Sequence, residues 1–307
     1  MRKKIVFTSI ILTIIFLLAA CGGNNNGNGN EEASYDPIVV SGKNWTEQYI
    51  LSQILAIYIE ENTEYDVDLR DGLGEVAILT PALENGEIDL YVEYTGTGLE
   101  AVLGEQAEEG ESSESIFDRV REGYEEDYNA TWLQPLGFEN NYTLAYTEHA
   151  DFEAQTYSDI AEISDGLSFG APHAFYERSG DGYDAFVEAY GFEFANTEAF
   201  DPNVMYQALI QGDVDVIPAF TTDGRIERED LRTTEDDLGF FPRYDAAIII
   251  RQETLDGYPG LEDVLNGLSG EFTEADMQQM NARVDIDNED YEPVAREFLI
   301  SKGLIEE

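Results

Sequence analysis

Hydrophobic residues follow two different spacings along this chain, and the two spacings alternate from residue 38 onward. Short apolar runs such as residues 38–40 are typical of buried strands. In the longer stretches between them, such as residues 45–60, apolar side chains recur every three or four positions and form one face of a helix. Strands that alternate with helices predict an α/β fold in which mixed, mostly parallel sheets carry flanking helices.

The same spacings predict where the individual elements lie. We expect Asn44 to cap the first helix, with Glu47 three residues on as its capping-box partner. Gly86 is expected to end the second helix. Strands are predicted over residues 38–40, 67–69, 88–94, 141–147, 167–170, 214–219 and 244–250, and helices over residues 45–60, 75–84, 183–189 and 204–211, within 105–126, and along 261–305.

One junction occurs twice in the chain. Residues 82–90, ALENGEIDL, resemble residues 208–216, ALIQGDVDV, and each reads as a helix end, a glycine and a strand. In the same register Tyr94 falls on Phe220. A chance match is one explanation, because helix–glycine–strand junctions are common. The other is that two similar lobes each place a ring at the carboxyl end of a strand, where open α/β sheets bind ligands.

The first 20 residues have the pattern of a secretory signal peptide. Three basic residues precede an apolar stretch, residues 5–18, that is shorter than the ~20 residues of a membrane span. The sequence LAAC at residues 18–21 resembles the lipobox of bacterial lipoproteins, in which the cysteine receives a diacylglyceryl group. We therefore expect a lipoprotein signal peptide over residues 1–20 and lipid attachment at Cys21. An ordinary secreted protein with an unused thiol is the alternative.

A segment rich in glycine and asparagine follows this leader. Residues 21–36 contain little that a folded domain could bury, and such a composition predicts a flexible tether. Two acyl chains hold a protein on a bilayer far better than one. The sequence thus predicts a domain on the extracellular face of the cell membrane, anchored through Cys21.

The chain is strongly acidic. Its formal net charge is −49, and removal of the three basic residues of the leader would make it −52. Repulsion on this scale weakens a compact fold at low ionic strength, whereas molar salt shortens the Debye length to ~3 Å. The composition therefore indicates very salty, or alternatively alkaline, surroundings. It also argues against nucleic acid as a partner, because nucleic acids bind positively charged surfaces.

Most familiar catalytic motifs are missing from the sequence. The two histidines, His149 and His173, are far apart and have no further ligand at metal-binding spacing, so we expect no metal site. Residues 72–77, GLGEVA, match the dinucleotide fingerprint GxGxxA. A lone match is weak, and we interpret the glycines as a tight strand-to-helix turn. We expect no cofactor and no enzymatic activity.

Five segments form a recognisable series. They are SGKNWTEQ at 41–48, GLG at 72–74, GEIDLY at 86–91, EYTGTG at 93–98 and FTTDGRI at 220–226. The first is similar to an SKxFTEQ opening, and the others follow in the order of the same family. The series resembles the substrate-binding lipoproteins of osmoprotectant ABC importers, which bind glycine betaine, choline, carnitine and related quaternary amines. The resemblance covers the chain from about residue 38 to its end.

The resemblance implies a two-lobed clamp with the type II periplasmic-binding-protein fold. Lobe 1 would comprise residues 37–140 and 244–307, and lobe 2 would comprise residues 141–243. The chain would cross between the lobes near residues 136–141 and 242–244. A monomer would close over its ligand and present it to the permease of an ABC importer.

A trimethylammonium group is a cation without an N–H donor, so ring faces rather than hydrogen bonds must hold it. The resemblance assigns this role to four rings, although Phe220 stands where some relatives carry tyrosine. Tyr91 is left out because it points to the opposite strand face from Tyr94. Core packing is the alternative for every ring, since the chain has 18 Tyr and 16 Phe. The implied cage is Tyr94, Tyr142, Phe220 and Tyr244.

A betaine ligand would also need partners for its carboxylate. The segment AFYER at residues 174–178 resembles the family's EFxxR, in which Arg178 would form two hydrogen bonds with a carboxylate. Lys43 could add a second charge or join the two lobes. For both basic residues the alternative is a surface salt bridge. The resemblance adds the hydroxyl of Thr97, the backbone N–H of Phe175, and Asn140 beside the cage.

Three other functions stay open from the sequence alone. A receptor for another small polar solute, such as an amino acid, would have no need of an aromatic cage. A secreted hydrolase would use a pair of carboxylates, and 65 acidic residues are too many to single out such a pair. A passive surface lipoprotein would bind no small ligand. The sequence does not choose among glycine betaine, proline betaine, carnitine and choline.

Overall fold

The structure, a computed structural model, describes residues 35–306 apart from residues 109 and 178–181, without the side chains of residues 174, 202 and 203. The predicted signal peptide, the lipid-attachment residue Cys21 and nearly all of the predicted tether lie outside the described residues. So does Arg178. In the part of the chain that is described, no helix is both long enough and apolar enough to span a membrane.

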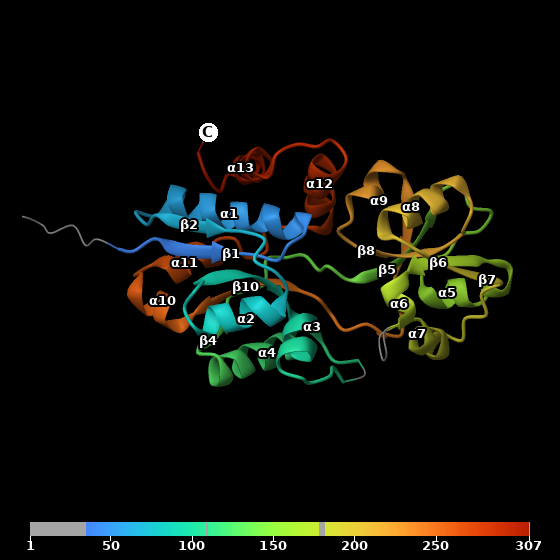
Figure 1. Ribbon diagram of the computed structural model, residues 1–307, viewed down its shortest axis with the longest axis horizontal. Coiled ribbons are helices and arrows are strands. Elements are labelled where there is room, and N and C mark those ends of the chain that lie inside the picture. Colours follow the sequence, from blue (N-terminus) through green and yellow to red (C-terminus); the bar gives the residue numbers. More distant parts are fainter. Residues whose placement is uncertain (1–34, 109, 178–181, 307) are drawn as a thin grey trace, which may run out of the picture. The chain divides into compact units, whose positions relative to one another are not determined.

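The first sheet has five strands in the order β2-β1-β3-β10-β4 (Figure 1). β1 pairs in parallel with β2 and β3, whereas β10 runs antiparallel to β3 and β4. Alternate side chains enter two cores: Val92 and Ile248 face one, and Tyr91 and Ile249 face the other. The strands are β1 (Ile38–Ser41), β2 (Val67–Arg70), β3 (Leu90–Tyr94), β4 (Ala130–Trp132) and β10 (Ala246–Arg251).

Helices cover both faces of this sheet. In Figure 1, α1 and α13 lie on one side of it, and α2 and α4 lie on the other. We call the sheet with its helices half 1. The helices are α1 (Thr46–Asn62), α2 (Val76–Glu84), α3 (Thr95–Thr97), the π-helical turn η1 (Gly98–Val102), α4 (Ser113–Asp127), α10 (Gln252–Gly257), α11 (Leu261–Asn266), α12 (Glu274–Asp285) and α13 (Tyr291–Ser301).

The elements between β4 and β10 form a second assembly, which we call half 2. Its strands pair as β8-β5-β9, all antiparallel, and as a parallel pair β6-β7 that touches β8 through a bridge between Phe169 and Val216. Its elements are β5 (Tyr142–Thr147), β6 (Ser168–Pro172), β7 (Asn196–Phe200), β8 (Ile217–Phe220), β9 (Leu231–Thr234), α5 (Tyr157–Ala161), η2 (Ser164–Gly166), α6 (His173–Glu177), α7 (Tyr183–Tyr190), α8 (Pro202–Gln211) and α9 (Gly224–Arg228).

The two halves repeat one strand order. With the bridge included, β7-β6-β8-β5-β9 in half 2 corresponds to β2-β1-β3-β10-β4 in half 1. The duplicated sequence junction lies at equivalent places. Gly86 and Gly212 have φ angles of 72° and 77°, and the next amides, of Glu87 and Asp213, each donate at 2.8 Å to a helix carbonyl. The match is therefore structural and not a chance similarity.

Two features of the fold differ from the sequence-based expectation. Among the described strands, three pairings are parallel and four are antiparallel, so the sheets are mixed but not mostly parallel. The reason is that β5 and β10 are reached by the segments that pass between the halves, and each enters its sheet in the reverse direction. The elements that were not predicted are β4, β7, β9, α3, α5, α6, α9, α10, η1 and η2. Each has only three to six residues, and none shows as clear an apolar run as the predicted strand at residues 38–40.

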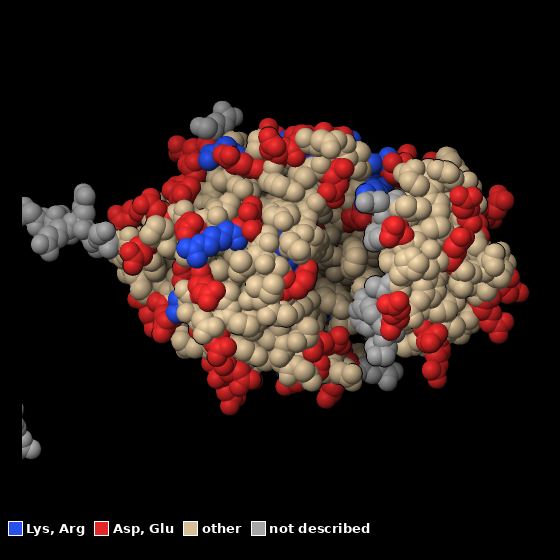
Figure 2. Space-filling model, viewed as in Figure 1, with Lys and Arg blue, Asp and Glu red and all other residues tan. Residues whose placement is uncertain are grey.

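Acidic side chains are scattered over the face seen in Figure 2 and far outnumber the basic side chains, which form only a few small groups on it. The acidic surplus of the sequence is thus placed on the solvated surface. Buried charged groups are few among the described residues. Lys43, Glu47 and Glu93 are 4%, 0% and 0% exposed, and all three lie near the cavity described next.

Candidate functional site

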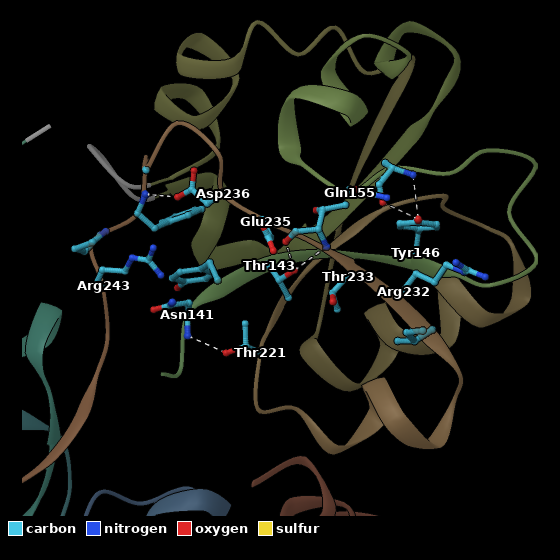
Figure 3. Close-up of a pocket in the computed structure, with 17 residues that line it drawn as sticks. Asn141, Thr143, Tyr146, Gln155, Thr221, Arg232, Thr233, Glu235, Asp236 and Arg243 are labelled. Carbon is cyan, nitrogen blue, oxygen red and sulfur yellow. Dashed lines mark hydrogen bonds between the residues drawn. The ribbon is translucent and has the colours of Figure 1, made fainter. Parts of the chain in front are cut away.

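The described part of the chain contains two large cavities, and the larger does not gather the predicted residues. It encloses about 800 Å³ and is lined by β5, β9 and the segment that leads back to half 1 (Figure 3). Of the predicted site residues only Tyr142 lines it. Its polar groups largely bond one another: Thr143 donates to the carbonyl of Thr234, and Tyr146 donates to that of Ala154.

The second cavity, of about 570 Å³, gathers seven of the nine predicted ligand-binding residues. Its lining comes from both halves and from a segment between them. We call it the central cavity. Its lining residues are Lys43, Asn44, Trp45, Glu75, Tyr94, Thr97, Asn140, Tyr142, Phe220 and Tyr244.

Half 1 contributes two rings to the central cavity. Tyr94 is the last residue of β3, and Trp45 directly precedes α1. Their ring centroids are 6.0 Å apart, and the planes are 28° from parallel. Trp45 was not among the predicted site residues. The signal that could have found it was present, because the resembling family has phenylalanine at this position of its opening motif.

Half 2 contributes Tyr142 and Phe220, which stand opposite each other on the antiparallel strands β5 and β8. Their ring centroids are 4.7 Å apart. The ring of Phe241 also stacks on the ring of Tyr142, and their centroids are 4.4 Å apart. Phe220 is 43% exposed, which is unusual for so large an apolar side chain and leaves its face open to a ligand.

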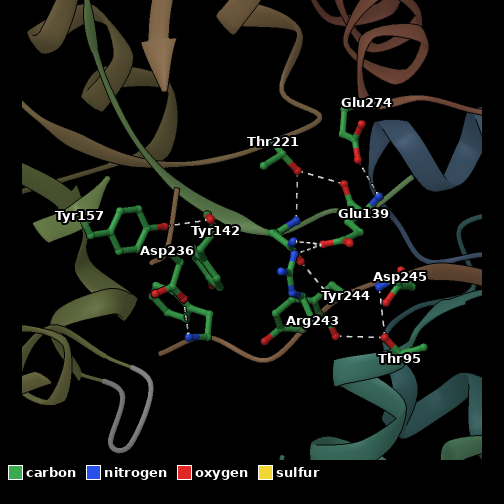
Figure 4. Close-up of polar contacts among 12 residues, drawn as sticks. Thr95, Glu139, Tyr142, Tyr157, Thr221, Asp236, Arg243, Tyr244, Asp245 and Glu274 are labelled. Atoms are coloured by element: carbon green, nitrogen blue, oxygen red, sulfur yellow. Dashed lines mark hydrogen bonds and ion pairs between the residues drawn. The ribbon is translucent and has the colours of Figure 1, made fainter. Parts of the chain in front are cut away.

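The fifth ring, Tyr244, belongs to the segment that returns to half 1. Thr95 fixes this segment: its hydroxyl donates to the carbonyl of Arg243 and accepts from the amide of Asp245, both at 3.0 Å (Figure 4). Gly96 lets the ring approach, since a Cβ there would lie 2.9 Å from Tyr244 and 2.8 Å from the Arg243 carbonyl oxygen. The glycine of the EYTGTG motif is therefore required by packing.

The two segments between the halves also contact each other. Glu139 and Asp245 form an antiparallel bridge, and Arg243 donates to the Glu139 carboxylate at 2.9 Å (Figure 4). The amide of Tyr244 donates to the side-chain oxygen of Asn141. These contacts lie where the sequence predicts the crossings. The lobe boundaries themselves stay a prediction.

Besides ligand binding, the sequence left two roles open for Lys43: a bridge between the two lobes and a surface salt bridge. The structure shows neither. The ammonium of Lys43 lies 2.5 Å from the Glu93 carboxylate, and both side chains are buried. Glu93 belongs to β3, so the pair neither lies on the surface nor joins the halves. The same ammonium lies 5.0 Å from the centroid of the Tyr94 ring, at the wall of the central cavity.

Glu47 is not the capping residue that the sequence predicts. α1 begins after Trp45 without any side-chain cap, and the Glu47 side chain turns inward and is fully buried. Its carboxylate accepts from the hydroxyl of Tyr94 at 2.5 Å, from the amide of Asn140 at 2.9 Å and from that of Asn281 at 3.2 Å. Burial raises the pKa of Glu47, and these hydrogen bonds oppose the rise.

Asn140 and Tyr94 thus serve the cavity wall and this buried carboxylate together. Asn140 is 7% exposed and lines the cavity. Burial, followed by the neighbouring Glu47, raises the pKa of Tyr94 well above its usual value. The phenol therefore stays neutral, and its hydroxyl donates a hydrogen bond to the carboxylate.

Two predicted residues do not line the central cavity. The Phe175 side chain is 4% exposed and packs in the core of half 2, with its ring centroid 6.4 Å from that of Tyr142. Only its backbone N–H, the group named by the resemblance, is left for a ligand. Arg178 lies outside the described residues. Neither role is tested by the structure.

The glycine-rich turn at residues 72–74 has a structural explanation. Gly72 has a φ of 65°, and a Cβ there would lie 2.5 Å from the Tyr49 hydroxyl. The backbone must therefore pass close to α1 in a conformation that favours glycine. Across the residues that the structure describes, no three His, Cys, Asp or Glu side chains are placed to hold a metal ion.

Residues 36–301 match the protein family described as "Substrate binding domain of ABC-type glycine betaine transport system". The carnitine transport binding protein OpuCC of Listeria monocytogenes is 33% identical over 277 residues, which cover 89% of each chain. A Helicobacter pylori protein named as an ergothioneine transport permease and ergothioneine binding protein, EgtU, is 33% identical over 306 residues. That match covers 99% of this chain but 54% of the Helicobacter protein, so the chain spans about half of it.

A solved structure shares the fold. A crystal structure of a glycine betaine/carnitine/choline ABC transporter protein superposes with a TM-score of 0.83 at 30% identity, covering 88% of this chain and 100% of that one. Structural neighbours of this kind are type II periplasmic binding proteins. The predicted two-lobed α/β fold class is therefore confirmed.

Proposed function

This chain belongs to the family of substrate-binding domains of ABC-type glycine betaine transport systems, and from that premise we propose that it captures quaternary ammonium compounds in the central cavity. The binding site would be the aromatic cage. By this we mean the five rings Trp45, Tyr94, Tyr142, Phe220 and Tyr244.

One observation carries the proposal: five rings from both halves of the chain line a single cavity. A trimethylammonium group has no hydrogen to donate, so it is bound by ring faces and by contact with its methyl groups. Each face contributes about 0.5–2 kcal/mol. Five faces together supply a large part of the roughly 8 kcal/mol that micromolar binding requires.

Because the rings are divided between the halves, a ligand bound in the cage would draw the two halves together. Trp45 and Tyr94 belong to half 1, whereas Tyr142 and Phe220 belong to half 2. A ligand that contacts both pairs favours the arrangement in which the halves approach. Ligand binding would thus select the closed form that a permease receives.

A zwitterionic ligand would place its carboxylate against the polar part of the site. Lys43, Thr97 and Asn140 line the cavity beside the rings. We assign Arg178 and the backbone N–H of Phe175 to the same carboxylate, on the strength of the AFYER motif. Choline has no carboxylate, so a role limited to betaines is expected for Arg178.

The family and the sequence together indicate how the protein is used. We propose an extracellular solute-binding lipoprotein, anchored through Cys21 and acting as a monomer, that delivers its ligand to an ABC permease. No catalytic step belongs to this function. The acidic surface fits a host that accumulates compatible solutes against high salt.

Calorimetric titration in molar salt tests the proposal. The panel is glycine betaine, proline betaine, carnitine, choline and ergothioneine, the last included because of the Helicobacter relative; ordinary amino acids serve as the competing class. We expect at least one quaternary amine to bind at micromolar concentration and the amino acids not to bind. Binding of amino acids alone, or of nothing, would reject the proposal.

Two cage variants locate the site. Tyr94→Ala and Tyr142→Ala each remove one ring face from a different half, and we expect each to weaken binding at least tenfold. Tyr35→Ala is the matched control, since its ring packs against Tyr65 and Tyr258 away from the cavity. Unchanged affinity in both cage variants would place the ligand elsewhere.

A further inference from the structure

The most deeply buried charge near the cage has no basic partner. Glu47 is fully buried, and no ion pair joins it to a lysine, arginine or histidine among the described residues. The other buried carboxylate, Glu93, is neutralised by the ammonium of Lys43 at 2.5 Å. Of the two buried carboxylates near the central cavity, Glu47 is therefore the one without a basic partner, and once ionised it places an uncompensated negative charge behind the cavity wall.

The hydrogen-bond donors around Glu47 stabilise its ionised form and partly offset the cost of its burial. An ionised carboxylate only accepts hydrogen bonds, and the described side chains that hydrogen-bond to this one are donors: Tyr94, Asn140 and Asn281, with Thr222 beside them. The amide oxygens of Asn140 and Asn281 are buried and have no hydrogen-bond partner. Both amides thus point their NH₂ groups toward the carboxylate and leave their own oxygens without a hydrogen-bond donor.

The carboxylate is connected to the cage by one residue. The Tyr94 hydroxyl donates to Glu47 at 2.5 Å, while the Tyr94 ring forms a wall of the cavity. A charge-assisted bond of this length draws the phenol proton toward the carboxylate and leaves the ring richer in electrons. A richer ring face attracts a cation more strongly, and the charge behind it adds a field that little water screens.

We propose that Glu47, acting through the Tyr94 ring, makes the central cavity select a cationic head group over a neutral group of the same shape. This inference rests on the proposed function. Contact with the methyl groups alone would bind a tert-butyl group nearly as well as trimethylammonium, since the two have the same size. The ring faces add an attraction for the cation, and in this proposal Glu47 strengthens it. Glu47 is a positioning and specificity residue in this proposal, because it does not line the cavity itself.

The test compares ligands that differ only in charge. Choline is paired with 3,3-dimethylbutan-1-ol and glycine betaine with 3,3-dimethylbutanoate, and each is titrated into the full-length folded domain by calorimetry. In the wild-type protein we expect the cationic member of at least one pair to bind at least tenfold more tightly. In Glu47→Gln we expect that member to lose about tenfold in affinity, or roughly 1.4 kcal/mol, and the member with the neutral tert-butyl head group to change less than twofold.

Glu47→Gln keeps the size of the side chain, and the unbonded oxygens of Asn140 and Asn281 can accept from the new amide after both groups rotate. Glu60→Gln is the matched control, because it makes the same substitution on an exposed position of the same helix. We expect it to leave both affinities within twofold of the wild type.

Tyr94→Phe provides a second route if Glu47→Gln does not fold. It keeps the ring and removes the bond to the carboxylate, so we expect the preference for the cation to fall about threefold with the neutral ligand unaffected. Equal losses for the cationic and neutral ligands in these variants would show a merely structural role and overturn the inference. A wild-type protein that binds neither member of either pair would instead refute the proposed function, on which the inference depends.

Discussion

At the scale of single residues, the site depends on contacts that bring groups closer than most side chains allow. Gly96 admits the ring of Tyr244, and Thr95 fixes the segment that carries it. Glu47 receives hydrogen bonds from three residues that are 47, 93 and 234 positions away in the chain. Even conservative substitutions at these positions are therefore expected to change the stability of the fold or the affinity for a ligand.

Replacing Gly96 by alanine is expected to displace the returning segment. The added Cβ would lie 2.8 Å from the carbonyl oxygen of Arg243, a backbone atom that cannot rotate away. We expect a loss of about 1–3 kcal/mol in the free energy of unfolding, measured by urea denaturation, and weaker ligand binding. Gly257→Ala is the control, because nothing lies within 4 Å of its Cβ position. Equal stability of the two variants would contradict the packing argument.

The buried carboxylate is also expected to shape the dependence of stability on pH. Burial raises the pKa of Glu47 above its usual value of 4.5, so the folded state keeps this proton to higher pH than the unfolded state does. Its contribution to the free energy of unfolding therefore falls as pH rises from about 4.5 through the folded-state pKa. Measured in molar salt, Glu47→Gln should gain stability relative to the wild type across this window. A difference that stays constant with pH would contradict the assignment.

At the scale of elements, the molecule uses one helix–glycine–strand junction twice. In both copies an aspartate accepts from an amide on the equivalent strand of its half: Asp89 from Val39 on β1, and Asp215 from Ser168 on β6, each at 2.8 Å. These junctions lead into β3 and β8. Because Tyr94 and Phe220 are the last residues of those strands, the repeat places one ring from each half at the cavity.

The second junction offers a clean test of its glycine. Gly212 has a φ of 77°, and nothing lies within 4 Å of a Cβ built there, so an alanine would suffer backbone strain alone. We expect Gly212→Ala to lose about 1–2 kcal/mol in the free energy of unfolding, the usual cost of this conformation for a residue with a Cβ. Gly166→Ala, which also has open space but no positive φ, should change by less than about 0.5 kcal/mol. A neutral Gly212→Ala would show that the junction tolerates another conformation.

At the scale of the whole molecule, charged side chains lie mostly on the surface, and few of the described ones are buried. Acidic side chains far outnumber basic ones on the face shown in Figure 2, and the net charge is −49. The two halves also contact each other at α9 and α12, where a Cβ on Gly224 would lie 2.4 Å from the backbone of Ala282. Repulsion between the halves must be overcome at such a contact, and salt is the agent that reduces it.

Stability is therefore expected to increase with ionic strength. Raising sodium chloride from 0.1 to 2 M should increase the melting temperature by roughly 10 °C, since a change of several kcal/mol corresponds to such a shift in a domain of this size. Potassium chloride should act equally, because screening depends on ionic strength. Sucrose at the same osmolality is the control for exclusion from the protein surface and should act less. A melting temperature that does not respond to salt would contradict the electrostatic argument.

The sequence by itself determined what depends on near neighbours in the chain. Apolar spacing located the longer helices and the buried strands, because a helix face or a strand shows its period within a few residues. The motifs located seven residues of the central cavity, including Tyr94, Thr97 and Phe220. The glycines of the motifs predicted the sharp turns, since only glycine adopts those backbone conformations freely.

Only the tertiary structure decided the roles that depend on distant partners. Glu47 reads as a helix cap from residues 44–47, yet burial against Asn281 and Tyr94 makes it an internal acceptor. From the sequence, Lys43 was assigned to the ligand with a surface salt bridge as the alternative, and only the fold brings Glu93 of β3 beside it as a buried partner. Short elements such as β7 and β9 form because a sheet edge is available to pair with, which no local pattern records. Burial and pairing are set by where the chain returns, and that is a property of the fold rather than of any segment.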